Sequence, residues 1–172
     1  FIILAAATGI IFATLLGTYA PFEALTHAAF QVGTIITTTG FATADFDQWS
    51  SLAKTVLVLL MFIGACAGST GGGIKVSRIV ACFKSAFREI GSYIHPRSVN
   101  RIKLEGRPVD NEVIRSINVY LTTYMLIFSL SILLVSIEGK DVVTTFTSVA
   151  ATINNIGPGL AVVGPTCNFS FF

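Results

Sequence analysis

Charged residues are scarce in this chain: they fill 12% of its 172 positions, whereas hydrophobic residues fill 53%. In an ordinary soluble domain about a quarter of the residues are charged. The composition therefore excludes such a domain and predicts an all-α integral membrane protein. Residues 114–137 support this prediction, because they carry no charge except Arg115 at their edge and can cross roughly 30 Å of hydrocarbon as a helix.

Cysteine is also rare, and the three cysteines show no C-x-x-C spacing. Two of them fall in apolar stretches, so we interpret Cys66, Cys82 and Cys167 as small apolar residues, not as metal ligands or a disulfide framework. The chain starts at Phe1 without an initiating methionine or a basic segment. We therefore expect no cleaved signal peptide, and we expect the chain to be part of a longer protein.

Basic residues are missing from most of the chain, because nine of the eleven Lys and Arg residues lie between positions 75 and 115. The remainder has two lysines against five acidic residues. Since cytoplasmic segments of membrane proteins carry an excess of Lys and Arg, we predict a cytoplasmic basic segment and an acidic outer side. Such a segment usually enforces topology, and nucleic-acid binding is not expected. Trp49, on the acidic side, is interpreted as an anchor at the membrane interface.

Two short apolar segments, residues 22–36 and 141–153, end in similar loops 117 positions apart. Fifteen helical residues span only about 22 Å, so each segment can enter a membrane and turn back but cannot cross it. The first loop contains Thr38, Thr39, Gly40 and Phe41, and the second contains Asn155, Ile156, Gly157 and Pro158. The same offset aligns residues 1–18 with 118–135, which are both apolar. The chain is therefore predicted to hold two units, each with a spanning helix, a re-entrant half-helix and a filter loop.

The loops have the features of a filter for a monovalent cation. A dehydrated cation needs a ring of oxygen ligands, and successive backbone carbonyls point inward only where residues leave ordinary strand or helix angles. Gly40 and Gly157 occupy equivalent positions and allow such angles at the least cost. The half-helices also direct their negative ends at the ion. One Thr-Thr-Gly alone would indicate an ordinary turn, but two copies in register favour a filter.

A glycine-rich run interrupts the helix expected over residues 52–87. Unbroken, that helix would be about 54 Å long, so a break inside the membrane is expected. Residues 64–73 contain five glycines, each roughly 1 kcal/mol less favourable than Ala in a helix. Irregular backbone at this depth survives only when it is buried in protein or faces water, which indicates a permeation pathway. A P-loop is excluded, because Ile74 separates Gly73 from Lys75 and neither Ser nor Thr follows the lysine directly.

These features divide the chain into three parts. Residues 1–87 are predicted to form one pore unit, residues 88–111 a basic cytoplasmic connector, and residues 112–172 a second pore unit that stops after its filter loop. Within the connector, residues 101–110 resemble a short hairpin that turns at Glu105 and Gly106.

Several stretches carry a resemblance to a known family. Thr38-Thr39-Gly40-Phe41-Ala42 is similar to a relaxed form of the Thr-Val-Gly-Tyr-Gly filter of potassium channels. The wider text resembles the Trk/Ktr/HKT superfamily of potassium transporters, and within it the bacterial TrkH-type membrane subunit, at residues 37–46, 64–75, 94–97 with 103–107, and 150–159. Ala42 replaces the last glycine of the channel motif and Pro158 replaces its aromatic residue. An asymmetric ring is therefore expected, and sodium stays a second candidate ion.

The resemblance implies four such units around one K⁺-conducting pore, with this chain as the third unit and the start of the fourth. It makes the glycine-rich run an intramembrane gate consisting of Gly68, Ser69, Thr70, Gly71, Gly72, Gly73 and Lys75. A packing face of small residues is the alternative. It also implies a multi-pass protein of the bacterial inner membrane, in contact with lipid, that works as a homodimer on a cytosolic nucleotide-binding gating subunit of the TrkA type. The docking residues for that subunit would be Arg97, Arg101, Lys103 and Arg107.

The sequence thus predicts the pore-forming subunit of a potassium uptake system, with K⁺ as the transported ligand, no organic cofactor and no enzymatic activity. One alternative is a potassium channel of four identical subunits, which is disfavoured because two nonidentical filters lie in one chain. The other is a membrane enzyme that uses Lys75 or His27 as a base. It is disfavoured because neither residue has a second catalytic group nearby in the sequence.

Overall fold

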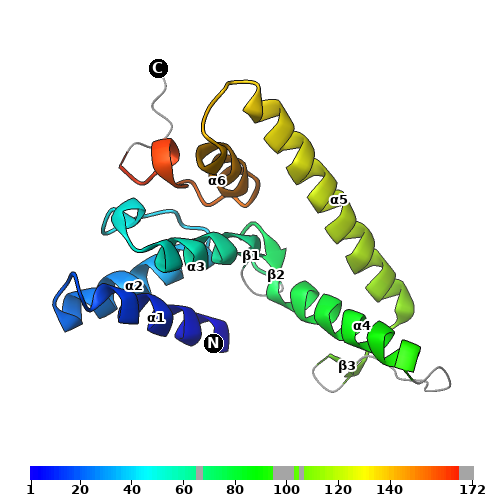
Figure 1. The fold of residues 1–172 in the computed structure, drawn as a ribbon. Coiled ribbons are helices and arrows are strands. Elements are labelled where there is room, and N and C mark those ends of the chain that lie inside the picture. The colour runs from blue at the N-terminus through cyan, green and yellow to red at the C-terminus, as the bar shows by residue number, and fades with distance from the viewer. Residues whose placement is uncertain (65–67, 95–102, 105–106, 167–172) are drawn as a thin grey trace.

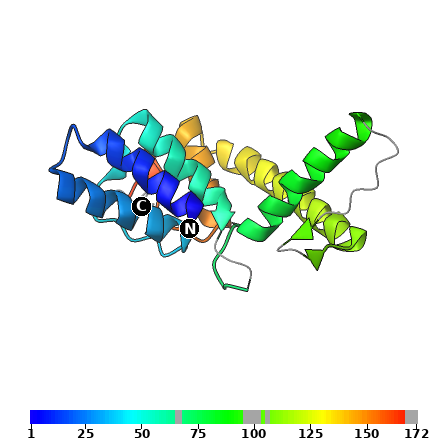
Figure 2. The same ribbon diagram turned by 90° about the horizontal axis from the view of Figure 1, so that it is seen from below.

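The computed structural model describes residues 1–64, 68–94, 103–104 and 107–166 of the chain. It is mainly helical, with a four-helix bundle at one end and a two-helix arm at the other (Figure 1). The bundle contains α1 (Ile2–Leu15), α2 (Pro21–Ile36), α3 (Ser51–Phe62) and α6 (Val142–Ile153), and the arm contains α4 (Val76–Ile94) and α5 (Asn111–Ser136). The view from below shows the same division (Figure 2).

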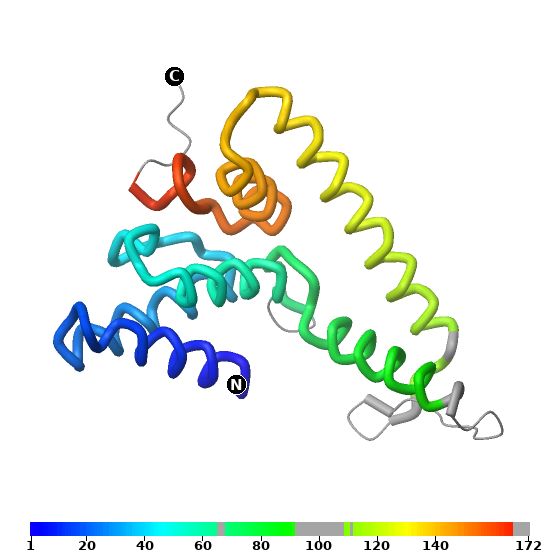
Figure 3. The backbone as a smooth tube through the Cα atoms, in the orientation of Figure 1, coloured from blue at the N-terminus to red at the C-terminus, as the bar shows by residue number. Residues whose placement is uncertain are grey.

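The core of the bundle lies where α1, α2 and α3 pack against one another. Ile11, Val32 and Leu57, one from each of these helices, have no exposed surface. Small residues such as Ala28 and Ala53, also fully buried, let the helices approach closely. Helix α6 joins the core through Val149 and Ala150, and it lies between α3 and α5 (Figure 3).

Local sequence explains where the short helices begin. Helix α2 starts at Pro21, whose missing N–H costs nothing in the first turn. The hydroxyl of Ser50 accepts a hydrogen bond from the backbone N–H of Ala53 and caps α3. The carboxylate of Asp141 accepts one from Val143 and caps α6 in the same way. Helices are therefore present in both segments that the sequence predicts to be half-helices, at Pro21–Ile36 and Val142–Ile153, and their re-entry into a membrane stays a prediction.

Helix α5 is the one helix of the described residues that is long and apolar enough to cross a membrane, at Glu112–Ser136. Most of its surface is exposed. The helix predicted over residues 1–18 is present as α1, and it ends at Leu15 because the chain turns at residues 16–18 before Pro21 starts α2. That this helix crosses a membrane stays a prediction.

The predicted break in the helix expected over residues 52–87 is confirmed. Helix α3 ends at Phe62, and two-residue strands β1 (Ile63–Gly64) and β2 (Ile74–Lys75) pair in parallel before α4 begins. The end of α4 differs from the prediction, since the helix continues to Ile94, seven residues beyond the expected end at Phe87. Its strongly amphipathic sequence keeps the helical pattern into the predicted connector.

The predicted hairpin in the connector is confirmed in the strands that the structure describes. Strands β3 (Lys103–Leu104) and β4 (Arg107–Pro108) pair antiparallel, with Lys103 opposite Pro108 and Leu104 opposite Arg107. The predicted turn at Glu105 and Gly106 lies outside the described residues.

Trp49 does not act as an interface anchor, contrary to the expectation from sequence. Its side chain is 6% exposed and belongs to the hydrophobic core. It packs edge to face against Phe46, with ring centroids 6.4 Å apart. Phe46 lies in the short helix η1 (Phe46–Gln48), which turns the chain back over the bundle toward α3.

Candidate functional site

The loops that follow α2 and α6 take the same backbone path. The two helices end 117 positions apart, at Ile36 and Ile153. After α2, the N–H of Thr39 donates to the carbonyl of Thr34 at 2.8 Å. After α6, the N–H of Ile156 donates to the carbonyl of Ala151, also at 2.8 Å and at the same offset. The repeat in the sequence is therefore a repeat in hydrogen bonding as well.

Backbone angles repeat in the same register. Thr38 and Asn155 have φ of 57° and 55°, values that residues with a side chain seldom adopt. Two positions later, Gly40 and Gly157 have φ of 81° and 106°. Each loop thus places a left-handed residue at every second position, which takes the backbone away from strand and helix angles. Such departures are needed before successive carbonyl oxygens can face one ion.

The two loops also touch each other. A Cβ atom added to Gly40 would lie 2.0 Å from the carbonyl oxygen of Ile156 and 3.3 Å from Cδ of Pro158. No side chain fits at such distances, so glycine is required here by contact as well as by its positive φ. The structure therefore brings Gly40 of the first loop together with Ile156 and Pro158 of the second. The side chain of Phe41 stays largely exposed.

The first loop is held at its start by local hydrogen bonds. The hydroxyl of Thr37, which directly follows α2, donates to the carbonyl of Gly33 at 2.7 Å. It also shares a hydrogen bond of 2.8 Å with the hydroxyl of Thr39. Thr37 is exposed, and all of these partners lie within four residues of it.

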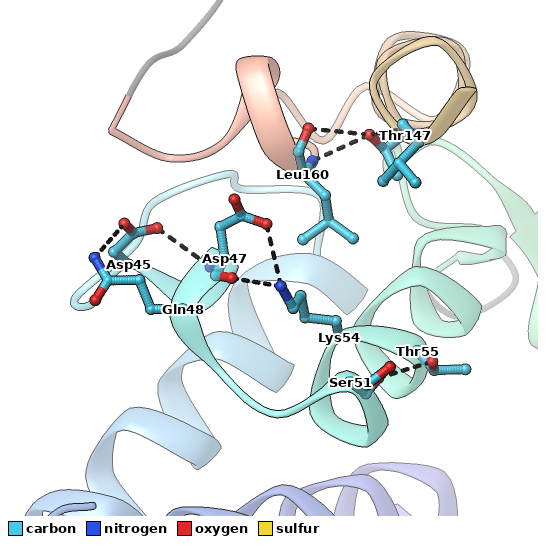
Figure 4. Close-up of polar contacts among 9 residues, drawn as sticks. Asp45, Asp47, Gln48, Ser51, Lys54, Thr55, Thr147 and Leu160 are labelled. Atoms are coloured by element: carbon cyan, nitrogen blue, oxygen red, sulfur yellow. Dashed lines mark hydrogen bonds and ion pairs between the residues drawn. The ribbon is translucent and has the colours of Figure 1, made fainter. Parts of the chain in front are cut away.

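The exit of the first loop is tied to the bundle by longer-range contacts. Nδ1 of His27, on α2, lies 2.9 Å from the hydroxyl of Thr43, and its ring packs against Tyr19. Farther on, Nζ of Lys54, on α3, donates to the backbone carbonyl of Asp47 and lies 3.6 Å from its carboxylate (Figure 4). The carboxylate of Asp45 accepts from the backbone N–H of Asp47 and caps η1.

The second loop starts at a buried polar residue that the sequence analysis did not single out. Asn154, the counterpart of Thr37, has no exposed surface. Its Oδ1 accepts a hydrogen bond of 2.9 Å from the hydroxyl of Tyr124 on α5, and its Nδ2 donates to the carbonyl of Ala150 at 2.8 Å. A polar side chain that is buried needs hydrogen-bond partners. The asparagine that follows an apolar stretch could therefore have indicated a bonded residue at the start of the loop.

The exit of the second loop is held by Thr147 of α6, which the sequence analysis also missed. The Thr147 hydroxyl donates to the carbonyl of Val143 at 2.8 Å and accepts from the N–H of Leu160 at 3.1 Å (Figure 4). Gly159 passes so close to Thr147 that an added Cβ would lie 3.0 Å from its hydroxyl oxygen. After this contact the chain enters the short helix η2 (Ala161–Val163).

The described part of the glycine-rich run, residues 68–73, forms a loop whose backbone is hydrogen-bonded by the ammonium group of Lys75. Nζ of Lys75 donates to the carbonyl of Ser69 at 2.7 Å, to its hydroxyl at 3.2 Å and to the carbonyl of Gly71 at 2.6 Å. Gly68 and Gly73 have positive φ, and Gly64 lies so close to the carbonyl of Gly72 that a Cβ atom would not fit. The start of the glycine-rich run, Gly64, thus lies next to its end, Gly72 and Gly73.

This loop reaches the start of the second filter loop. A Cβ atom added to Gly72 would lie 2.0 Å from the backbone carbonyl oxygen of Asn154, and one added to Gly73 would lie 3.4 Å from its Oδ1. The predicted gate is thus in direct contact with Asn154, the residue directly before the predicted filter residues of the second loop.

The predicted docking residues are only partly described. Arg97 and Arg101 lie outside the described residues, whereas Lys103 and Arg107 lie on the paired strands β3 and β4. Within the part of the chain that the structure describes, no three His, Cys, Asp or Glu side chains gather in a way that could hold a metal ion.

Comparison with known proteins identifies the family to which the chain is similar. The family model TrkH, described as a cation transport protein, matches residues 1–171. The Trk system potassium uptake protein TrkH of Salmonella typhimurium is 42% identical over 139 residues, which are 81% of this chain and 29% of that protein. The Trk system potassium uptake protein TrkI of Halomonas elongata is 30% identical over 87% of this chain and 30% of that protein.

A solved structure has the same fold. The crystal structure of the potassium transporter TrkH from Vibrio parahaemolyticus matches with a TM-score of 0.86 and 38% identity, over 94% of this chain and 35% of that one. The chain thus spans about three tenths of the length of the curated relatives it matches. With a family model matched over nearly every residue and relatives about 40% identical, the chain belongs to the TrkH family of cation transport proteins.

Proposed function

We propose that the two loops are parts of one potassium filter, and that this chain is a portion of the pore-forming subunit of a potassium uptake system. The carrying observation is the pair of left-handed positions, Thr38 with Gly40 and Asn155 with Gly157, at the same register in two loops that touch. The names of the relatives support K⁺ as the ion. Sodium is the second candidate, because Ala42 and Pro158 depart from the potassium-channel motif.

Conduction in this account needs no covalent chemistry. Backbone oxygens of Thr38, Thr39, Gly40 and Phe41, and of Asn155, Ile156, Gly157 and Pro158, would replace the water around a dehydrated ion. Helices α2 and α6 end at the loops, so the negative ends of both dipoles are directed at the ion. The relatives are about three times as long as this chain, which leaves room for the further units that a closed ring requires.

The glycine-rich loop is proposed as the gate of this pore. Gly72 lies against the backbone of Asn154, at the end of the filter where α6 ends. An obstruction there would block the passage of ions out of the filter. The three hydrogen bonds from Lys75 hold residues 69–71 in this position, and the charged ammonium group there would repel a cation. A packing face of small residues is the competing role, because close backbone contact alone satisfies it.

The surroundings of the chain follow from the same proposal. The protein would be a multi-pass protein of the bacterial inner membrane, with the basic connector in the cytoplasm. A homodimer would rest on a cytosolic nucleotide-binding gating subunit of the TrkA type. Lys103 and Arg107 lie on a folded hairpin, which topology alone does not require, and this supports a docking role for the connector.

The rival functions are less well supported. Two nonidentical loops in one chain argue against a channel of four identical subunits. Lys75 donates three hydrogen bonds from its ammonium group, so no lone pair is available for a base. His27 is engaged by Thr43 at the loop exit, and its ring packs on Tyr19. Neither residue has the arrangement of a catalytic base.

The filter proposal is tested by flux through the full-length protein in liposomes. Gly40→Ser should lower the ratio of potassium to sodium uptake, because a side chain there collides with the Ile156 carbonyl and opposes the positive φ. Gly9→Ser in α1 is the matched control, since an added Cβ meets nothing within 4 Å. An unchanged ratio in Gly40→Ser would remove Gly40 from the filter.

A further inference from the structure

Three aromatic side chains stack in a row along α5. Tyr120, Tyr124 and Phe128 follow one another at four-residue spacing on one face of the helix. Ring centroids are 6.4 Å apart both from Tyr120 to Tyr124 and from Tyr124 to Phe128. Tyr124 and Phe128 are 9% and 6% exposed, whereas residues on the other faces of α5 are largely exposed. We call these three residues the aromatic row.

One end of the row is fixed in the bundle. Phe128 packs edge to face against Phe62, the last residue of α3, and against Phe146 of α6, with centroid distances of 5.3 Å in both cases. Edge-to-face pairs add a directional preference to the burial of the rings. The position of the row relative to the half-helix α6 is therefore well determined.

The middle of the row bonds to the base of the second loop. The hydroxyl of Tyr124 donates to Oδ1 of Asn154, and the amide of Asn154 is bonded back to Ala150. The next residue, Asn155, has a left-handed φ of 55°. The buried side chain of Asn154, hydrogen-bonded on both sides, fixes the backbone directly before this residue.

The other end of the row contacts the helix beyond the glycine-rich loop. The guanidinium carbon of Arg78, on α4, lies 4.1 Å from the centroid of the Tyr120 ring, which is a cation–π contact. Arg78 is three residues from Lys75, whose ammonium group donates hydrogen bonds to carbonyls of that loop. One continuous set of contacts thus runs from α4 through Arg78, Tyr120 and Tyr124 to the second loop.

The first loop has no comparable support in the described residues. Its counterpart of Asn154 is Thr37, which is exposed and bonds only to Gly33, Thr34 and Thr39. If the aromatic row served packing alone, the hydroxyl of Tyr124 would not need to meet a polar residue directly before the loop. The specific bond to Asn154 is what a packing role leaves unexplained.

We propose that Tyr124 and Asn154 are positioning residues that hold the second loop in its ion-binding shape, and that Arg78 and Tyr120 link this hold to the position of α4. A displacement of α4 would then change the filter itself, besides any movement of the glycine-rich loop. This inference rests on the proposed role of the loops as a filter, and its test separates the two.

The test uses the full-length protein in liposomes and measures the ratio of potassium to sodium flux. Tyr124→Phe removes only the hydroxyl and keeps the ring in the row. The ratio should fall about fivefold, the size expected when one buried hydrogen bond is lost. Thr122→Val is the matched control, because it removes a hydroxyl from an exposed position of the same helix, where the group bonds only to Asn118. It should leave the ratio unchanged.

The link to α4 has its own pair of variants. Tyr120→Leu removes the cation–π contact and should lower the ratio about twofold. Tyr120→Phe keeps a ring under Arg78 and should behave as the wild type. Equal ratios for Tyr120→Leu and Tyr120→Phe would show that α4 does not act through this residue.

Two outcomes separate this inference from the filter proposal. If Gly40→Ser changes the ratio while well-folded Tyr124→Phe does not, the positioning role is wrong and the filter remains. If neither variant changes it, the filter proposal fails and the inference fails with it. Elution of each variant as a single species in size-exclusion chromatography establishes that it is folded.

Discussion

The two loops at the ends of α2 and α6 share a backbone path but differ in what holds them. Both have left-handed residues at the same two positions and the same capping hydrogen bonds. The first starts at the exposed Thr37, held by its own helix, whereas the second starts at the buried Asn154, held by α5 and touched by the glycine-rich loop. The shared path can be explained by the demands of an ion, and the different supports by the different neighbours of each loop.

Adding a methyl group to each loop glycine tests whether Gly40 and Gly157 are equivalent positions. Gly40→Ala should strongly lower potassium uptake, because the added Cβ would overlap the Ile156 carbonyl. An added Cβ at Gly157 meets nothing within 4 Å in this chain, although its φ is also positive. If the loops form a ring of four, Gly157 faces the next loop in the full-length protein, and Gly157→Ala should be equally severe. Uptake close to wild type in Gly157→Ala would contradict a ring of equivalent loops.

The contact between the glycine-rich loop and the second filter loop predicts the next largest effect. Gly72→Ala should push the glycine-rich loop away from Asn154 and raise potassium flux in the absence of the cytosolic partner. Deletion of residues 68–73 should raise the potassium flux further. Lys75→Ala should raise it less, because the hydrogen bonds of Lys75 go to Ser69 and Gly71 of the glycine-rich loop. These changes are measured as flux from liposomes that contain no partner.

The matched variant for the gate prediction is Gly68→Ala. Gly68 has a positive φ of 88°, but an added Cβ would meet nothing within 4 Å. Gly72 has no positive φ, so Gly72→Ala adds the collision without this backbone strain, whereas Gly68→Ala adds the strain without a collision. A well-folded Gly72→Ala protein whose flux equals that of Gly68→Ala would show that the loop is a packing face.

A smaller effect is expected at the exit of the second loop. Thr147→Val keeps the shape of the side chain but leaves the N–H of Leu160 without its acceptor. The loss of a hydrogen bond of this kind should lower the free energy of unfolding by about 1 kcal/mol. Thermal unfolding of the protein in detergent measures the change, and Thr26→Val, at an exposed hydroxyl bonded only within α2, is the control. Equal stability of the two variants would contradict a bracing role for Thr147.

The smallest effect is expected at the exit of the first loop. Lys54→Met breaks the ion pair with Asp47, whose side chains are each about one-third exposed. Pairs with this much exposure contribute roughly 0 to 1 kcal/mol, and salt screens them. The difference in melting temperature between Lys54→Met and wild type should therefore shrink as salt is added. A loss greater than that of Thr147→Val would reverse the proposed order of the two braces.

Sequence alone predicted the elements that depend on local pattern. The two half-helices, the long apolar helix, the break near Gly64 and the hairpin around residues 103–108 were all predicted, because each follows from length, hydropathy or glycine content. The end of α4 was wrong by seven residues, since its amphipathic pattern runs past the first basic residues. Trp49 was misplaced because burial depends on how η1 folds back onto the bundle, which composition does not show.

The long-range parts of the site could not be predicted. Asn154 is separated from Tyr124 by thirty positions, and nothing local indicates that their side chains meet. The contact between Gly72 and the backbone of Asn154 likewise depends on how α3, α4 and α6 pack together. The candidate filter residues could be singled out because the motif occurs twice, at a constant offset, and their binding of an ion stays a prediction.

The central claim is that the two loops bind one dehydrated cation together. Crystals of the full-length protein grown in rubidium test it most directly, through the anomalous scattering of the ion. The account predicts a rubidium peak between the loops, within ligand distance of carbonyl oxygens from residues 38–41 and 155–158. It also predicts that Gly40→Ser weakens that peak. Rubidium bound elsewhere along the pore, with none between the two loops in a protein that still transports it, would contradict the account.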